Sequence, residues 1–463
     1  MPRLLREHSP LIEEFFATSR LALPVVFTNI GLVAMGLIDT LIVGQVGPAS
    51  LAGVGAGSGV FFTIGIVGMG ILGSLDTFVS QAFGAKEERV CDNLLIQGIW
   101  LALLLGLLLL PVIWVVGRFY GLTGATTDIV LAASPYIQTV SWSLPVFLLF
   151  IALQKYWQAL GVVMPATYIV FVANVVNFFG ATALARGLWG APAMGAKGVA
   201  VATVGTRVFM AIALVGYTCW RLRRRQQKEA GRRLLWGQFR FSWRVQRQLL
   251  RLGLPAGAQS GAEVLAFTLT TILATRLGAG AAAAHHIVLT IASTTFMMPL
   301  GIGNAGAVRV GNLVGAGAHR AATRAGWMAI GLGVLVMTMS AVVLCAFPTF
   351  LFGLFTNDAV VLVQGQKIMI FAALFQIFDG TQVTSTFALR GLGDTRSAMI
   401  ANIIGHYPIG LLLGFSLCFL QDRGLPGLWA GLTFGLITVA TLTVLSWRQK
   451  ARALVLTAER SLT

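Results

Sequence analysis

Long apolar runs recur along the whole chain, and short polar or charged stretches separate them. A helix needs about 20 mostly apolar residues to cross the hydrocarbon core of a bilayer, and by that rule the pattern predicts twelve spanning helices. The expected spans are roughly 21–46, 51–81, 93–117, 129–154, 160–185, 196–220, 252–277, 284–312, 322–346, 361–388, 398–420 and 426–448. We therefore expect an all-α, polytopic membrane protein.

The second half of the chain repeats the first at an offset of 231 residues. Arg20–Pro24 (RLALP) matches Arg251–Pro255 (RLGLP). The same offset pairs Thr40 with Thr271, Gly47 with Gly278, Gly70 with Gly301, Val79 with Val310, and Gly84–Ala85 with Gly315–Ala316. Further along, Gln158–Gly161 resembles Arg390–Gly393, and Gly195 and Gly198 resemble Gly424 and Gly427.

This repeat predicts the domain organisation. Six spans per copy is an even number, so the second copy enters the membrane from the same side as the first, and the copies are parallel. We expect an N-terminal lobe at 1–220, a basic cytoplasmic linker at 221–250 and a C-terminal lobe at 251–463. A duplicated apolar chain of this kind is typical of a transporter with its site between two halves.

The composition supports a membrane protein and bounds its partners. The chain is 57% hydrophobic and 11% charged, with a mean hydropathy of +0.83, which excludes an ordinary soluble globule. The net charge is +17, but eleven basic residues lie between Arg221 and Arg251, in the connection between two apolar runs. Such a loop is typical of the positive-inside rule, so we expect no nucleic-acid partner; anionic lipid headgroups are an alternative. The distribution of Lys and Arg over the other loops places both termini in the cytoplasm.

The four cysteines indicate neither a metal site nor a redox motif. Cys91, Cys219, Cys345 and Cys418 lie far apart, and we interpret them as small apolar residues in helices. We expect no cofactor other than a coupling ion.

Three carboxylates lie inside predicted spans: Asp39, Glu263 and Asp379. A carboxylate at membrane depth is costly, and such residues usually face a bundle interior and mark an ion or substrate path. Glu263 and Asp379 lie near the centres of their spans, whereas Asp39 lies toward the outer end of its own. Asp76 lies near the cytoplasmic end of its span, where we expect the interface to solvate it.

Other polar residues accompany these carboxylates at helical spacing. The sets are Gln259, Glu263 and Thr270; Gln376, Asp379 and Gln382; and Thr28 and Asp39. Carboxylate, amide and hydroxyl oxygens are hard ligands that suit Na⁺, and a carboxylate removed from water also binds a proton readily. The alternative is structural pairing with the basic residues Arg207, Lys367 or Arg309. Asn174 and Asn177 either bond across helices or line a cavity. His285, His286 and His406 could serve either role, but such histidines are more often satisfied hydrogen-bonders than proton relays.

Several of these motifs resemble the MATE (multidrug and toxic compound extrusion) family. The segments Leu21–Pro24 and Gly36–Thr40 look like its first span, and Gly253–Glu263 looks like its seventh. The remaining matches are Ala283–His285, Met298–Gly303, Arg309–Asn312, Phe375–Asp379 and Leu389–Asp394. Together they cover nearly the whole chain, and the acids Glu263 and Asp379 point to the NorM-type branch.

The resemblance implies a twelve-helix exporter with an opening between two six-helix lobes. Such proteins expel cationic, amphipathic compounds in exchange for inward Na⁺ or H⁺. By position, Glu263 and Asp379 would bind the coupling cation, and Asp39 would serve the N-terminal lobe beside Asn174 and Asn177. This chain has Phe375 where some NorM-type members carry a tyrosine, so one potential ligand hydroxyl is missing. The two asparagines are also three residues apart, where the family more often has four.

These observations predict a cation-coupled antiporter that works by alternating access in the bacterial inner membrane. We expect Phe296, Met297 and Met298 to line a drug-binding surface, because aromatic and thioether side chains adapt to varied lipophilic cations. We expect the protein to act as a monomer. A lipid-linked oligosaccharide or polysaccharide flippase of related architecture is the alternative, although it should have a cationic centre. An intramembrane enzyme is not expected, because no nucleophile, metal cluster or catalytic dyad appears at depth.

Overall fold

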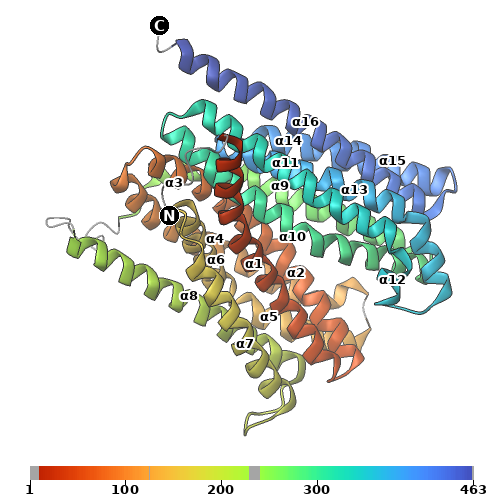
Figure 1. The fold of residues 1–463 in the computed structure, drawn as a ribbon. Helices are drawn as coiled ribbons and strands as arrows, with labels where there is room; N and C mark the ends of the chain where they lie inside the picture. Colours follow the sequence, from red (N-terminus) through yellow and green to blue (C-terminus); the bar gives the residue numbers. More distant parts are fainter. Residues whose placement is uncertain (1–9, 125, 229–239, 461–463) are drawn as a thin grey trace. The chain divides into compact units, whose positions relative to one another are not determined.

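The computed structural model describes residues 10–124, 126–228 and 240–460 (Figure 1). Every regular element in these residues is a helix, and ten helical segments are long and apolar enough to cross a membrane. A bent pair of helices makes an eleventh. The predicted all-α polytopic membrane fold is therefore confirmed.

The first half of the chain contains nine helical elements. They are α1 (Pro10–Gly44), α2 (Pro48–Leu72), α3 (Ser74–Gly84), α4 (Glu88–Arg118), η1 (Tyr120–Thr123), α5 (Thr127–Ser141), α6 (Leu144–Ala159), α7 (Met164–Arg186) and α8 (Gly195–Lys228). The second half contains α9 (Trp243–Thr275), α10 (Ala279–Gly315), α11 (His319–Ala346), α12 (Pro348–Gly353), α13 (Ala359–Gly391), α14 (Arg396–Ile404), η3 (Gly405–Leu411), α15 (Leu412–Phe415), η4 (Ser416–Leu420) and α16 (Gly424–Arg460).

Three predicted spans are less regular than the sequence suggested. The span predicted at 129–154 consists of α5 and α6, which are bent by 50°. Pro145 at the start of α6 has no N–H to continue the helix, which accounts for the break. The span at 51–81 changes from α2 to α3 at Gly73, and the span at 398–420 contains two π-helical segments, η3 and η4.

Helix α9 corresponds to the predicted span 252–277 but is not among the ten apolar segments in the part of the chain that the structure describes. It is 33 residues long, so length is not the reason. Gln259, Ser260 and Glu263 interrupt its apolar sequence. Helix α9, which is long but is not among the apolar segments, therefore carries one of the three carboxylates, Glu263.

The chain forms two compact units that exchange helix segments. The N-terminal unit comprises Phe27–Phe83 and Glu87–Gly257, and the C-terminal unit comprises Met1–Val26, Gly84–Lys86 and Ala258–Thr463. The boundaries fall inside α1 after Val26 and inside α9 after Gly257, which are equivalent positions at the repeat offset of 231. The lobes predicted at 1–220 and 251–463 are continuous in sequence, unlike these units, and they stay a prediction. Residues 229–239 of the predicted linker lie outside the described residues.

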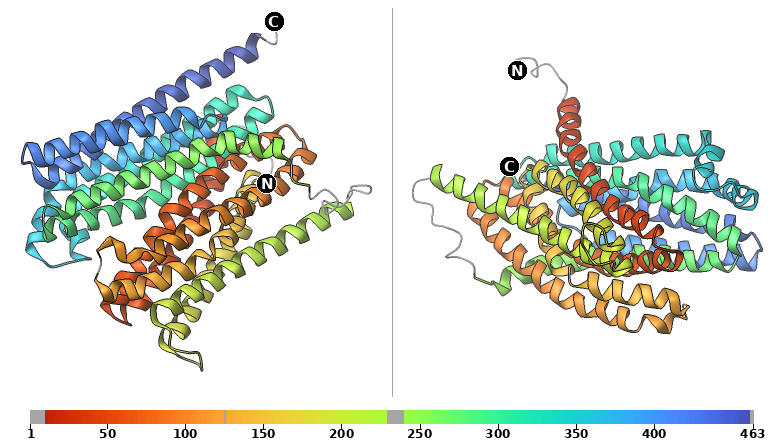
Figure 2. Two further views of the ribbon diagram at one scale, coloured as in Figure 1. Left: turned by 180° about the vertical axis from the view of Figure 1, so that it is seen from behind. Right: turned by 90° about the horizontal axis from the view of Figure 1, so that it is seen from below.

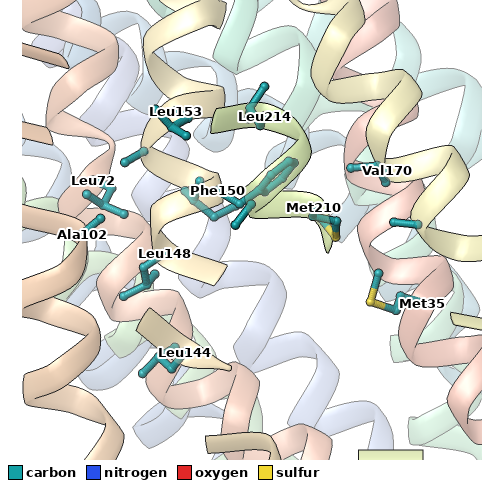
Figure 3. Packing of buried hydrophobic residues seen from close by; sticks show 14 of the residues in the cluster. Met35, Leu72, Ala102, Leu144, Leu148, Phe150, Leu153, Val170, Met210 and Leu214 are labelled. Atoms are coloured by element: carbon teal, nitrogen blue, oxygen red, sulfur yellow. The ribbon is translucent and has the colours of Figure 1, made fainter. Parts of the chain in front are cut away.

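Each unit has its own packed interior. In the N-terminal unit, side chains such as Leu72, Ala102, Leu148 and Phe150 pack together from α2, α4 and α6, with Met210 of α8 beside them (Figure 3). In the C-terminal unit, α10, α11, α13 and α16 pack side by side (Figures 1 and 2). Because lipid is as apolar as these side chains, close van der Waals packing rather than exclusion of water holds such helices together.

Close helix contacts repeat at equivalent glycines in the two units. A Cβ atom added to Gly70 would lie 2.8 Å from the Cα of Gly257, and one added to Gly301 would lie 2.9 Å from the backbone N of Val26. Gly70 and Gly301 are related by the offset of 231 residues, and so are Val26 and Gly257. The sequence repeat is therefore also a repeat of three-dimensional contacts.

Glycine turns are duplicated in the same way. Gly161 after α6 has φ 75° and Gly393 after α13 has φ 84°, while Gly195, the first residue of α8, has φ 55° and Gly424, the first residue of α16, has φ 57°. This left-handed region is strained for residues that carry a Cβ atom, so glycine is favoured at these turns in both copies.

Candidate functional site

Two of the predicted carboxylates come together inside the C-terminal unit. Glu263 extends from α9 and is partly buried, and Asp379 extends from α13 and is 4% exposed. The Nε2 atom of Gln382 donates to Oε1 of Glu263 at 3.1 Å. Asp379 interacts electrostatically with Glu263 and with the same Gln382 side chain. Gln382 therefore bridges the two acids, as its position three residues after Asp379 on one helix face allows.

The segment α14–η3 completes this acidic cluster. Nδ2 of Asn402 lies 3.4 Å from Oε2 of Glu263, and the Tyr407 hydroxyl donates to the carbonyl oxygen of Ala262 at 3.0 Å. Tyr407 lies in a π-helical segment, and such segments are often found at functional sites. We name Glu263, Asp379, Gln382 and Asn402 the C-terminal cluster.

Basic side chains do not neutralise the C-terminal cluster. Among the described residues, no ion pair involves Glu263 or Asp379. Arg309, one of the partners considered from the sequence, instead forms two hydrogen bonds with Glu14, at 2.9 and 2.7 Å. The pairing alternative is therefore wrong for Arg309.

The cluster offers hard oxygen ligands. In addition to the carboxylates, Oε1 of Gln382, Oδ1 of Asn402 and Oε1 of Gln259 are buried without a hydrogen-bond partner. Buried polar atoms of this kind usually have partners, so unpaired oxygens beside two acids call for a functional explanation. This donor set fits Na⁺ or a shared proton. No group of three His, Cys, Asp or Glu residues in the described chain suits a transition metal.

Of the other residues predicted for this half, Gln376 lies on α13 with Asp379, whereas Phe296 and Met297 lie on α10. Gln376 is paired with Thr295 of α10, its Nε2 lying 2.8 Å from the hydroxyl oxygen. Phe296 packs beside the cluster formed by Ala307, Val383 and Phe387, and Met297 is half-buried. Their predicted role in drug binding stays a prediction.

The third carboxylate lies in a different environment, inside the N-terminal unit. Asp39 of α1 is 2% exposed, and its Oδ2 accepts a hydrogen bond from the Thr203 hydroxyl of α8 at 2.8 Å. Asn177 of α7 lies on the same network, its Nδ2 3.5 Å from the Thr203 hydroxyl. We name Asp39, Asn177, Thr203 and the neighbouring Arg207 the N-terminal cluster.

Two further residues predicted for this half join helices outside the network. Nδ2 of Asn174 donates to the carbonyl oxygens of Gly31 at 2.9 Å and Val170 at 2.8 Å, so it connects α7 to α1. The Thr28 and Thr167 hydroxyls lie 2.7 Å apart and connect the same two helices. Of the asparagine pair, Asn177 is thus the one that belongs with Asp39.

The expectation for Asp76 was wrong. Its side chain is fully buried, and it forms an ion pair with Lys155 of α6 at 2.8 Å. A carboxylate removed from water requires a compensating charge, and Lys155 supplies it.

Sequence reasoning missed Asn402, Tyr407, Thr203 and Tyr136 as members or neighbours of these clusters. Asn402 and His406 are one helical turn apart inside an apolar span, and that polar face was a usable signal. Thr203 and Tyr136 gave none, because threonine and tyrosine are common in helices of any environment.

Comparisons with known proteins identify the family. The MatE family model matches residues 24–182 and again residues 255–416, two segments that begin 231 residues apart. The chain belongs to the MatE family.

Relatives cover almost the entire chain. A "Probable multidrug resistance protein NorM" of Mesorhizobium japonicum is 34% identical over 450 residues, with 95% of both chains covered. A protein of the same description from Xanthomonas campestris pv. campestris is 34% identical over 441 residues, again with 95% of both chains covered.

Solved structures share the fold at lower identity. The eukaryotic MATE transporter AtDTX14 has a TM-score of 0.84 at 20% identity and covers 97% of this chain and 100% of its own. A MATE structure in the bent conformation has a TM-score of 0.86 at 18% identity, with coverage of 98% and 99%. A MOP superfamily transporter from Pyrococcus furiosus, described as having a binding pocket of reverse polarity, has a TM-score of 0.84 at 19% identity, with coverage of 95% and 96%.

Proposed function

We propose that this protein is a secondary transporter that exports cationic, amphipathic compounds in exchange for Na⁺ or H⁺. The observation that carries the proposal is the C-terminal cluster: two carboxylates and several amide oxygens, without a basic partner among the described residues, inside a MatE fold. Such a site gains stability when a cation or proton enters it, because buried like charges repel each other.

Coupling requires the ion and the drug to bind two conformations with different affinity. A cation at Glu263 and Asp379 cancels the repulsion between these carboxylates and favours one arrangement of α9 and α13. A cationic drug that competes for the same carboxylates favours the other arrangement. This competition supplies the coupling free energy that alternating access needs.

The proposed substrate class follows from the charge of the site and from the relatives, which are described as multidrug resistance proteins. An acidic cluster selects positive charge, and Phe296 and Met297 offer adaptable apolar surface on the neighbouring helix α10. We place the protein in the bacterial inner membrane with both termini in the cytoplasm, on the distribution of Lys and Arg among the loops.

A flippase for lipid-linked oligosaccharides is the second candidate, because the fold is shared with a MOP superfamily transporter whose binding pocket is described as having reverse polarity. A pyrophosphate-linked substrate requires a cationic site. The C-terminal cluster is acidic, which favours export of cations.

The experiment is efflux of ethidium from proteoliposomes with a Na⁺ gradient and a pH gradient imposed separately. Glu263→Gln and Asp379→Asn should each lower the efflux driven by the wild-type gradient by about 10- to 100-fold. Asp128→Asn is the matched control, because this carboxylate is exposed at the start of α5. Undiminished gradient-driven efflux in both variants of the cluster would refute the coupling assignment.

A further inference from the structure

Arg207 is a cation built into the interior of the N-terminal unit. It lies in α8, which is one of the helices apolar enough to span a membrane. Its guanidinium carbon is 4.0 Å from the ring centroid of Phe61 and 5.0 Å from that of Phe147. Its Nη1 donates to the Ser143 hydroxyl at 2.6 Å. Three helices and one connecting residue therefore fix the guanidinium: α8 carries it, α2 and α6 supply the rings, and Ser143 lies at the break between α5 and α6.

The position of Arg207 on α8 places it beside the Asp39 network. Thr203, which donates to Asp39, precedes Arg207 by four residues, so both side chains lie on one face of the helix. The titratable groups that interact electrostatically with Arg207 are Asp39 of α1 and Tyr136 of α5. The Tyr136 hydroxyl is engaged with the Ser58 hydroxyl at 3.0 Å, which leaves Asp39 as the acidic group of the neighbourhood.

A carboxylate and a guanidinium at membrane depth compensate each other even without direct contact. No ion pair within 4.0 Å joins Asp39 and Arg207 in the described residues, but the low dielectric of a helix bundle extends the range of their attraction. The same positive charge repels any further cation that approaches Asp39. The C-terminal cluster has no such resident charge.

We propose that Arg207 is a tethered counter-ion that takes the place of the coupling ion in the N-terminal cluster. This inference rests on the proposed function and deepens it: Asp39 and Arg207 form a fixed, internally compensated pair, and the number of ions exchanged per transport cycle is set by Glu263 and Asp379 alone. Arg207 thus acts as a positioning residue that determines ion stoichiometry.

A purely structural role for Arg207 predicts something different. Ser143 follows α5 directly at its break with α6, so Arg207 could simply stabilise this break. In that case the charge of Asp39 would be irrelevant to the effect of removing Arg207. Variants that change both charges together therefore separate the two roles.

The first experiment counts ions. We would measure, in proteoliposomes, the Na⁺ or H⁺ gradient that just balances an imposed ethidium gradient. The proteins compared are the wild type, Arg207→Gln, Arg207→Lys and the double variant Asp39→Asn/Arg207→Gln. Arg207→Gln should exchange one ion more per cycle than the wild type, because Asp39 then lacks its counter-charge and recruits an external one. Arg207→Lys and the double variant should show the wild-type number. A wild-type ion count in Arg207→Gln overturns the inference.

The second experiment measures thermal stability, so it gives a result even if the single variants fold poorly. Removing one partner of a buried pair leaves an uncompensated charge, so Asp39→Asn and Arg207→Gln should each lower Tm, while the double variant should recover at least half of the summed loss. Additive losses would overturn the inference. The stability cycle does not depend on Glu263: if Glu263→Gln keeps its coupling, the proposed function fails, whereas the Tm values of the Asp39–Arg207 cycle still report on this pair.

Discussion

The N-terminal and C-terminal clusters both place a carboxylate inside a membrane helix bundle, but they compensate its charge in different ways. Asp39 has the guanidinium of Arg207 as a neighbour, held in place by two aromatic rings and a serine hydroxyl. Glu263 and Asp379 have amide groups and each other. At the repeat offset of 231, Asp39 corresponds to Thr270, Glu263 to Leu32 and Arg207 to Thr438, so the duplicated scaffold carries different charged residues in its two copies.

Backbone geometry reinforces the difference. The span of the second repeat that carries Asn402 and Tyr407 contains two π-helical segments, whereas its counterpart in the first repeat, α7, is continuous. Conversely, α13 is continuous where its counterpart breaks between α5 and α6. In the C-terminal unit the π-helical segment lies beside Glu263. In the N-terminal unit the break between α5 and α6 lies beside Arg207. In each unit the backbone therefore departs from a regular helix next to a charged side chain of the cluster.

The first prediction, with the largest change in transport, tests whether ion-driven efflux depends on the C-terminal cluster but not on the N-terminal cluster. Glu263→Gln should lower gradient-driven ethidium efflux by about 10- to 100-fold, the range that a loss of ordinary coupling free energy produces. Asp39→Asn should reduce the amount of folded protein, but the molecules that fold should keep the ion response of the wild type. Efflux normalised to folded protein measures both. The comparison fails if Asp39→Asn loses its ion response as completely as Glu263→Gln.

The second prediction concerns the equivalent glycine contacts and tests whether the two units pack their helices in the same way. Gly70→Ala and Gly301→Ala should each destabilise the protein by about 1–3 kcal/mol, because the added methyl group meets the backbone of a neighbouring helix. Gly59→Ala in α2 and Gly331→Ala in α11 are matched controls, since an added Cβ atom meets nothing within 4 Å at either site. Thermal unfolding in detergent gives the values. Losses at one glycine only would show that the two contacts are not equivalent.

A smaller effect concerns the amide groups around the acids. Gln382→Leu and Asn402→Leu should weaken the apparent affinity for the coupling ion by about tenfold, because groups that orient or supplement a ligand typically contribute this much. Asn177→Leu in the N-terminal cluster should leave that affinity unchanged. Titration of transport rate against Na⁺ concentration or pH provides the measurement, and a shift for Asn177→Leu equal to the others would contradict the distinction between the clusters.

The smallest effect concerns the loops after the duplicated turns. Gly161 and Gly393 are equivalent, but only the second is followed by a carboxylate, Asp394, which pairs with Lys450 at 2.8 Å. Burial raises the pKa of Asp394, but hydrogen bonds from Lys450 and Ser397 outweigh it, so the pKa is lowered from 3.8.

A carboxyl with a lowered pKa stabilises the folded state above its unfolded-state pKa, and the contribution is lost as the pH falls through the folded-state value. Asp394→Asn should therefore lower Tm slightly at pH 7 and have no effect well below pH 3.8. The loss at pH 7 is small because Lys450 is 46% exposed and solvent screens the pair. A Tm difference that persists in acid would assign the effect to something other than charge.

The apolar pattern and the repeat predicted the helical fold well, because each span must be apolar over its whole length and each duplicated glycine serves the same contact. The breaks were harder to predict. Pro145 breaks its span, but Pro24, Pro111 and Pro255 lie inside continuous helices, so a proline alone did not predict where a span is interrupted.

The acids were predictable for a different reason: a charge such as Glu263 or Asp379 in an apolar run stands out against its surroundings. The partners of these acids could not be predicted in this way. Whether Arg207 or Arg309 faces a given acid depends on helix packing rather than on spacing along the chain. Arg309 reaches Glu14, 295 residues away in sequence, and no periodicity encodes such a pair.

The exchange of the first halves of α1 and α9 also fixes the order in which the molecule can be completed during synthesis. Residues up to Val26 emerge first, yet they belong to the unit that otherwise begins at Ala258. The N-terminal unit in turn needs the chain as far as Gly257 before its last segment exists. The N-terminal unit therefore cannot finish folding when its own repeat leaves the ribosome, and it exposes an incomplete helix bundle until the second repeat has started. A chain that stops after the first repeat therefore lacks the segment up to Gly257 and leaves an unfinished unit rather than a finished half.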